Sequence, residues 1–374
     1  MPAQKGVLPD NLYLNLLVDG REFPYATTIT MKHEVNSART IHCQFTGRGG
    51  LEACRLGAKV ELSWHKNSPS SALFDDARSF VGIIKTISPG ENSSAFMAFD
   101  YVTHLAESQF TYYKAEDYIG EDLYFAAARA CDYKGIDVTR LTSGSGIFIT
   151  KDMNLFGWKT RKEFIDACFN EMKLLVDDGQ HPRNTILQWY YGIRKDNIMD
   201  FFLPDPKMEA AFEYLTVSES DNNVASGGLV SQIDTSQMIN TITVASKTDE
   251  TLYAQLEDGP SIDKHGVASY FLQYDSINEA ELYNIGYEVL NNYNKPSIYY
   301  NITTQNTDDI SLGDLIKVEI PSVHAALYSS SEDILTLIGY EMSISETVST
   351  RLKIGEKPLT ISQMIDILKK PTDR

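Results

Sequence analysis

The chain has 374 residues, of which 43% are hydrophobic and 22% charged, as is ordinary for a globular protein of two or three domains. Acidic residues outnumber basic ones 51 to 33, and the resulting net charge of −18 argues against a protein that grips nucleic acid through its phosphates. No apolar run approaches the roughly 18 residues of a membrane-spanning helix, so we expect no membrane insertion.

The N-terminus and the cysteines predict folding in a reducing compartment. Residues 1–20 lack the long apolar core of a secretory signal. Cys43, Cys54, Cys131 and Cys168 are scattered without a CxxC pair, which favours reduced, buried thiols over disulfides or a metal site. We therefore expect the chain to fold in a cytoplasm.

Residues 1–112 predict a first small β-barrel. A Val-Asp-Gly turn in "NLYLNLLVDGREFPY" indicates a hairpin. The runs "ATTITMKHEVNSARTIHCQFTG", "GAKVELSW", "SFVGIIKTIS" and "SSAFMAFDY" continue the alternation of apolar and polar residues. Several short strands at this spacing are typical of a barrel or sandwich.

Residues 113–217 predict a small α+β domain. Helices are expected over 121–135 and 160–179, the second opened by a capping box of Thr160 and Glu163. Between them, "SGSGIFIT" predicts a turn and a short strand, and its glycines are too few and wrongly spaced for a phosphate loop.

The end of this middle region, "NTILQWYYGIRKDNIMDFFLP", predicts two strands around the turn 194–197. Its aromatic cluster, Trp189–Gly192 with Phe201 and Phe202, has the stacking surface that a sugar or a base would need. Packing in the core of a small domain is the favoured interpretation.

Residues 218–356 predict a second β-barrel, which begins after a polar linker or long loop over 218–237. A helix is expected over 276–294, with Ser276 as N-cap and Glu279 completing a capping box.

Residues 357–374 predict a C-terminal helical tail. Its apolar side chains would dock onto a partner, a neighbouring subunit or the chain's own barrel; they are Ile361, Met364, Ile365 and Leu368.

The two strand-rich regions repeat one pattern. "LGAKVELSW" is followed by "FVGIIKTIS", and "LGDLIKVEIPS" by "LIGYEMSIS"; the upstream strands "TTITMKHEV" and "INTITVASK" are matched as well. Gly57 lies 25 residues before Gly82, and Gly313 lies 26 before Gly339. Glycines at and within strands mark tight bends or bulges, so we predict a duplication. The predicted fold class is mainly β, with two similar barrels flanking and joined by an α+β domain and a short C-terminal helix.

The order of these segments resembles the phage late-control-D-like tail proteins, the baseplate hubs of contractile and related tails. The first half carries "LLVDGREF", "TITMKHEVNSARTIHCQF" and "LGAKVELSW". The second carries "DTSQMINTITV", "ISLGDLIKVEIP" and an S-I-x-K-x-G segment formed by Ser261, Ile262, Lys264 and Gly266. The resemblance covers about residues 12–356 and is weakest in the middle domain.

This resemblance implies a homotrimer whose two tail-tube-like barrels per subunit alternate around a ring of pseudo-sixfold symmetry. Such a hub joins a sixfold tail tube, or a distal tail ring protein, to a threefold central spike or tail-tip protein, and it contacts other baseplate proteins. DNA would only pass through the lumen, which carboxylates would keep from adhering. The expected location is the virion tail baseplate, assembled in the host cytoplasm.

No catalytic motif accompanies this pattern. The seven histidines lack metal spacing, no nucleophile elbow is present, and we expect no enzyme activity, cofactor or metal. We expect no appended lysozyme or peptidase domain, and any cell-wall cutting is therefore expected from a partner. Two alternatives stay open: a tail-associated cell-wall hydrolase or carbohydrate-binding module, and a hexameric distal tail ring protein.

Overall fold

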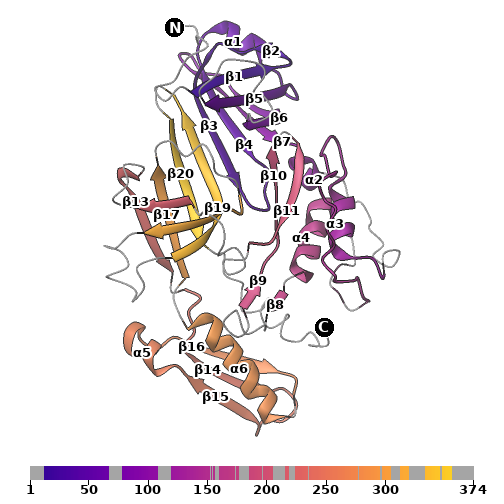
Figure 1. Cartoon of the computed structure of the whole chain (residues 1–374), viewed down its shortest axis with the longest axis vertical. Helices are drawn as coiled ribbons and strands as arrows, with labels where there is room; N and C mark the ends of the chain where they lie inside the picture. Colours follow the sequence, from indigo (N-terminus) through magenta and orange to yellow (C-terminus); the bar gives the residue numbers. More distant parts are fainter. Residues whose placement is uncertain are drawn as a thin grey trace.

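The computed structural model describes most of the chain (Figure 1). The described ranges are residues 12–66, 78–107, 119–204, 215–218, 224–304, 312–319 and 333–355, with short gaps at 152, 154, 156–159, 173, 177–184, 196, 235, 277, 295–296 and 346–347. Within these ranges no helix combines the length and the apolarity that crossing a membrane would require.

A first set of strands comes from the N-terminal hundred residues, as the sequence predicts. These strands are β1 (Leu12–Val18), β2 (Arg21–Glu22), β3 (Ala26–Glu34), β4 (Thr40–Phe45), β5 (Lys59–Lys66), β6 (Arg78–Ser88) and β7 (Ser94–Asp100), with the short helix α1 (Arg48–Ala53) after β4. β1 and β2 form the predicted hairpin, because Asp19 and Gly20 both take positive φ in a two-residue turn. Apolar residues alternate along these strands, so one face of the sheet is buried.

A second set of strands comes from the C-terminal part of the chain. Its members are β12 (Leu215–Ser218), β13 (Val224–Asp234), β17 (Ser297–Thr304), β18 (Leu315–Glu319), β19 (Asp333–Ile344) and β20 (Val348–Gly355). In space the first set is ordered β3-β4-β7-β6-β5-β1 and the second β13-β17-β20-β19-β18-β12. The two orders correspond strand for strand. They differ at the last member, because β1 is antiparallel to β5 whereas β12 is parallel to β18.

We call these two sets the first unit and the second unit. They do not form two separate barrels held apart by the middle domain. β19 pairs directly with β3, so both units belong to one 13-stranded sheet over a shared hydrophobic core. Among the described strands no pairing closes either unit into a barrel. The mainly β prediction is confirmed, whereas the arrangement as two closed barrels is corrected.

The middle of the chain forms an α+β layer beside the sheet (Figure 1). Its elements are α2 (Thr103–Glu107), α3 (Leu123–Cys131), α4 (Arg161–Glu171), the hairpin β8–β9 (Leu174–Val176 and Thr185–Leu187) and the hairpin β10–β11 (Tyr190–Lys195 and Ile198–Phe202). The predicted capping box of α4 is present, with Glu163 N–H donating to the Thr160 hydroxyl and Thr160 N–H donating to the Glu163 carboxylate. The predicted short strand of "SGSGIFIT" reduces to one isolated bridge at Phe148.

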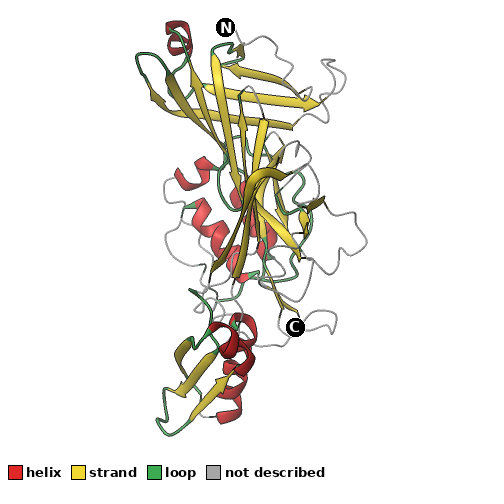
Figure 2. Ribbon diagram, turned by 90° about the vertical axis from the view of Figure 1, so that its left-hand side faces the viewer, coloured by secondary structure: helices red, strands yellow, loops and turns green. Residues whose placement is uncertain are grey.

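Residues 239–293 form a further subdomain with its own core, below the rest in Figures 1 and 2. A three-stranded sheet of β14 (Thr241–Ser246), β15 (Tyr253–Glu257) and β16 (Ser269–Tyr274) packs against α6 (Glu279–Tyr293), beside the short α5 (Gly259–His265). This subdomain interrupts the connection between β13 and β17, where the first unit has only the turn between β3 and β4.

Four predictions in this region are corrected. Residues 224–234 of the predicted linker form the strand β13, and "INTITVASK" lies in the subdomain rather than in the second unit. The N-cap of α6 is Asn278, whose side chain accepts from Ala280 N–H, in place of Ser276. The helix expected over 276–294 therefore covers the subdomain's sheet and is no part of a barrel.

Candidate assembly interface

The same glycine turn opens the corresponding strands of both units. Gly57 and Gly313 precede β5 and β18 with φ of +81° and +86°, a region that favours glycine. Gly57 N–H donates to Ile84 O, and Ile84 N–H donates to Ala58 O. Gly313 N–H donates to Leu337 O in the same way, and Leu337 N–H donates to Asp314 O. Ile84 and Leu337 are therefore structural counterparts.

A bulge follows at the same place in both units. The pairing of β6 with β7 skips one residue between Ile84 and Thr86, and the pairing of β19 with β20 skips one between Leu337 and Gly339. Thr86 is thus the counterpart of Gly339. Gly82, which the spacing of the sequence pattern predicts as the counterpart of Gly339, lies four residues earlier inside β6, opposite Val60. The added Cβ of any other residue at position 82 would lie 2.3 Å from Phe99 O.

The register continues across the remaining strands. Thr86 lies opposite Met97 of β7, and Gly339 lies opposite Lys353 of β20. Following the pairs outward leads from Met97 through His42 to Thr30 of β3, and from Lys353 through Asn301 to Val230 of β13. Each residue of β3 in this register therefore corresponds to the residue of β13 numbered 200 higher (230 − 30 = 200).

The two units meet in a six-residue antiparallel ladder between β3 and β19, which we call the internal joint. Gly339 lies opposite Glu34, Tyr340 opposite His33 and Ile344 opposite Ile29. Val35 N–H extends the ladder by donating to the carbonyl of Ile338, the bulged residue. An ion pair of Lys353 with Glu34 crosses the joint at its half-exposed edge.

A buried histidine lies at the internal joint. His33 Nδ1 lies 3.4 Å from the Tyr340 hydroxyl, while its Nε2 is buried with no hydrogen-bond partner among the described residues. Burial holds the pKa of His33 well below its usual value, and the nearby Arg39 guanidinium lowers it further. A neutral imidazole is therefore required here near neutral pH.

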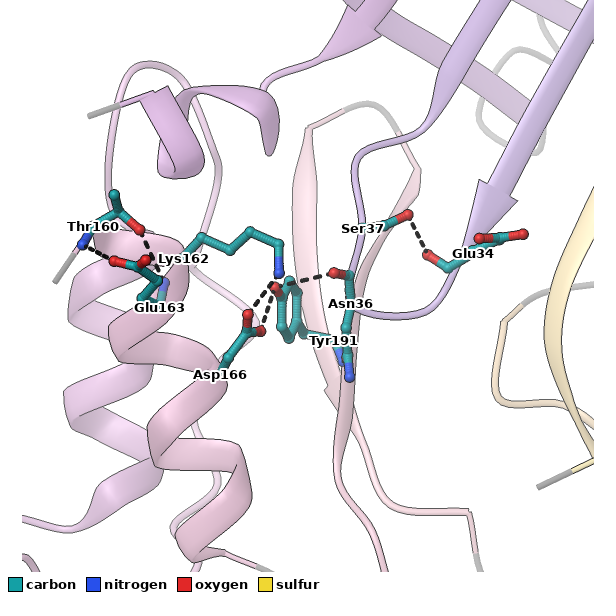
Figure 3. Close-up of polar contacts among 8 residues, drawn as sticks. All are labelled: Glu34, Asn36, Ser37, Thr160, Lys162, Glu163, Asp166 and Tyr191. Carbon is teal, nitrogen blue, oxygen red and sulfur yellow. Dashed lines mark hydrogen bonds and ion pairs between the residues drawn. The ribbon is translucent and has the colours of Figure 1, made fainter. Parts of the chain in front are cut away.

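The turn between β3 and β4 attaches the sheet to the α+β layer (Figure 3). Asn36, at φ +58°, accepts from Tyr191 N–H through Oδ1 at 2.9 Å and donates its own N–H to Tyr191 O. The Tyr191 hydroxyl donates to Asp166 Oδ1 at 2.9 Å, and Lys162 Nζ lies 2.6 Å from Asp166 Oδ2. In the second unit the equivalent connection carries the inserted subdomain instead.

Four rings of the aromatic cluster in the middle region lie in the interior, and Trp189 is partly buried. In the hairpin β10–β11, Tyr190 and Phe202 face the core of the large sheet, whereas Tyr191 and Phe201 face the core of the α+β layer. The hairpin thus connects the two cores, and these buried rings offer no stacking surface to a sugar or a base.

The four cysteines and the Ser-Gly loop are likewise buried or bonded within the chain. All four cysteines are free and buried, and burial raises the pKa of their thiols, which disfavours the reactive thiolate. The donors of the Ser-Gly loop bind a carboxylate of the same chain, because Ser145 and Gly146 donate hydrogen bonds to Asp122. No group of three potential metal ligands occurs among the described residues.

Sequence reasoning located the repeated turn at Gly57 and Gly313 but missed the internal joint. The strands of the joint lie far apart in the chain, and His33 is separated from Tyr340 by 307 residues. The predicted docking helix, with Ile361, Met364, Ile365 and Leu368, lies outside the described residues.

Comparison with known proteins gives a likeness in fold. No protein-family model matches the chain, and no curated protein matches its sequence. A tail protein from Neisseria meningitidis MC58 is similar in structure, with a TM-score of 0.56 and 12% identity over 94% of this chain and 98% of the other. The 43 kDa tail protein of prophage MuSo2 from Shewanella oneidensis matches over the same shares, with a TM-score of 0.58 and 12% identity. The chain therefore has a fold found in tail proteins, including one of a prophage.

Proposed function

We propose that this protein is the structural hub of a phage or phage-like tail baseplate. In this proposal three chains form a ring, and their six β-units alternate between first and second around a pseudo-sixfold axis. The duplicated strand order supports the proposal most directly, because two similar units per chain let a trimer present six similar elements.

The similarity in fold to two tail proteins supports a role in a phage-type tail. Both similar structures are tail proteins, and each is covered almost completely by this chain. A hub of this kind would bind the tail tube or a distal ring protein on its sixfold side and a spike or tip protein on its threefold side. The net charge of −18 suits a lumen through which DNA passes without adhering.

The proposed role is structural and without catalysis. Buried thiols with a raised pKa and aromatic rings packed in two cores support it, since both groups are withdrawn from solvent. A clearing assay on cell-wall or polysaccharide substrate tests this part. Clearing that an acidic-residue substitution abolishes would favour the hydrolase alternative.

The oligomeric state tests the hub proposal itself. Light scattering on the purified 42.0 kDa chain is expected to give the mass of a trimer, and negative-stain electron microscopy a ring with a central hole and near-sixfold outline. A hexamer would instead favour a distal tail ring protein. A chain that stays monomeric with its tail partners would contradict the hub.

A further inference from the structure

Among the described residues, β13 and the end of β6 are two of the places where an edge of the large sheet lacks a strand partner. β13 is at the end of the sheet and pairs only with β17. In β6, residues Thr86–Ser88 pair with β7 on one side, but the ladder with β5 on the other side ends at Ile83. Thr86 and Ser88 are exposed and Ile87 is half-buried.

The internal joint indicates which strand each of these two edges can pair with. Thr86–Ser88 of β6 correspond to residues 339–341 of β19, which pair with β3. The counterpart of β3 is β13, the other open edge. Each half of a second joint is therefore present on the chain. In the strand order the two halves are separated by the six strands β17, β20, β19, β3, β4 and β7, and they do not pair with each other within this structure.

We propose that β13 of one subunit adds as an antiparallel strand to Thr86–Ser88 of β6 in the next subunit, an inference that rests on the hub proposal. The register is carried over from the internal joint by the offset of 200. Thr86 then lies opposite the neighbour's Asp234, Ile87 opposite its Ile233 and Ser88 opposite its Gln232.

The hydrogen-bond pattern of this joint follows from the internal one. Val35 N–H donates to Ile338 O, and in an antiparallel ladder the bonded pairs recur at every second residue, so Tyr340 and His33 form the next bonded pair. Their counterparts are Ile87 and the neighbour's Ile233. The free N–H and C=O of Ile87 are thus satisfied by the incoming strand.

Pro89 limits the length of the ladder. The next bonded pair would fall at residue 89, and proline has no N–H to donate. The joint between subunits is therefore three residues long, against six within the chain. Proline at this place also prevents the edge from recruiting longer strands, a common protection of exposed sheet edges.

The two edges differ, so the contact is head-to-tail. Contacts of this type either close into a ring or extend without limit, depending on the rotation between subunits. In the trimer of the hub proposal, three internal joints and three joints between subunits would alternate around one closed ring.

Disulfide trapping tests the register. Ser88 and Gln232 occupy an unbonded pair, where the Cα atoms of antiparallel strands lie close enough for a disulfide. The double variant Ser88→Cys/Gln232→Cys, mildly oxidised, is expected to form covalent dimers and trimers on a non-reducing gel. The native cysteines are buried and give a low background.

Two matched controls accompany this variant. Ser88→Cys/Ile233→Cys moves the second thiol by one residue, which turns it to the other face of the strand, and should cross-link at least tenfold more slowly. Each single-cysteine variant should stay uncross-linked in isolation, whereas a mixture of Ser88→Cys and Gln232→Cys chains should give dimers only.

Light scattering on the same samples separates the two proposals. Trimers that the Ser88→Cys/Gln232→Cys pair does not trap, or traps no faster than the shifted control, would overturn the strand joint and leave the hub. Selective trapping in an assembly other than a trimer would support the joint and contradict the hub. A protein that neither assembles nor cross-links would overturn both.

Discussion

Of the charged side chains in the described part of the structure, Arg39 and Asp100 are the most deeply buried, 2% and 0% exposed. Arg39 Nε lies 3.1 Å from Asp100 Oδ2, and the pair ties the start of β4 to the end of β7. Burial raises the pKa of Asp100, which Arg39 opposes by favouring the charged carboxylate. A charge left alone at this depth is costly because water cannot solvate it.

Arg39→Met is therefore expected to lower the free energy of unfolding by about 3–5 kcal/mol, measured by urea titration at neutral pH. The double variant Arg39→Met/Asp100→Leu should recover most of the lost free energy of unfolding, because it removes the buried carboxylate that the single variant leaves unpaired. Arg48→Met, which breaks an ion pair that is 92% and 68% exposed, is the matched control and should cost less than about 1 kcal/mol. Equal losses from both single variants would refute the importance of burial.

His33 predicts acid sensitivity of the internal joint. Its folded-state pKa lies well below the unfolded value of about 6.5, so below that pH the unfolded chain binds a proton that the folded chain does not. Stability is therefore fully present above about pH 6.5 and declines as the pH falls, by at most about 1.4 kcal/mol per pH unit from this group.

The variant His33→Phe should flatten that part of the stability–pH curve between about pH 6.5 and 5. Comparing it with the wild type isolates His33, since the two chains share every other titrating group. Parallel curves would show that the imidazole becomes protonated within the fold.

At the scale of single elements, the two glycine turns give a matched pair of substitutions. Gly57 has positive φ but no atom within 4 Å of an added Cβ, whereas at Gly313 that Cβ would lie 2.4 Å from Cδ2 of Phe202. Gly57→Ala should thus cost only the backbone strain, about 1–2 kcal/mol. Gly313→Ala should cost about 1–3 kcal/mol more, because the ring of Phe202 must move within a packed core.

Chemical denaturation of the two variants measures this difference. Each turn makes the same pair of backbone hydrogen bonds, so strain alone would affect both alike. A Gly57→Ala variant that is destabilised as much as Gly313→Ala would mean that the contact with Phe202 contributes nothing.

At the scale of the whole molecule, the subdomain at residues 239–293 is an insertion into a hairpin. Its core is separate, and the flanking residues Asp234 and Ser297 lie directly opposite each other in β13 and β17. Replacing residues 235–296 by Asn-Gly would turn this connection into a two-residue turn like that at Asp19-Gly20.

The shortened chain is expected to keep the large sheet and the α+β layer, with its free energy of unfolding changed by less than about 1 kcal/mol, since loop length alone has a small effect. Circular dichroism and thermal unfolding check this. Loss of cooperative unfolding would show that the subdomain supports the sheet.

The sequence predicted where the strands of the large sheet lie along the chain better than which strands pair with each other. Alternation located β3 to β7, β18 and β19 because those strands have one buried face. β13 was assigned to a linker because "VASGGLVSQID" is polar and glycine-bearing, and its edge position demands less apolar character. Gly82 was matched to Gly339 on spacing alone, since the bulges that fix the true alignment at Thr86 leave no mark in the sequence.

The internal joint has a consequence for the newly made chain. β3 is synthesised early, but its partner β19 follows about 300 residues later, which at typical ribosomal rates is roughly 15–60 s. For that interval the edge strand β3 of the N-terminal sheet remains unpaired, and an unpaired edge strand tends to pair with strands of other chains. Two nascent chains on one message would each offer the other a strand related to the missing one, namely β6, the counterpart of β19. Folding yield should therefore fall with crowding of ribosomes, so that slower initiation of translation favours the native product.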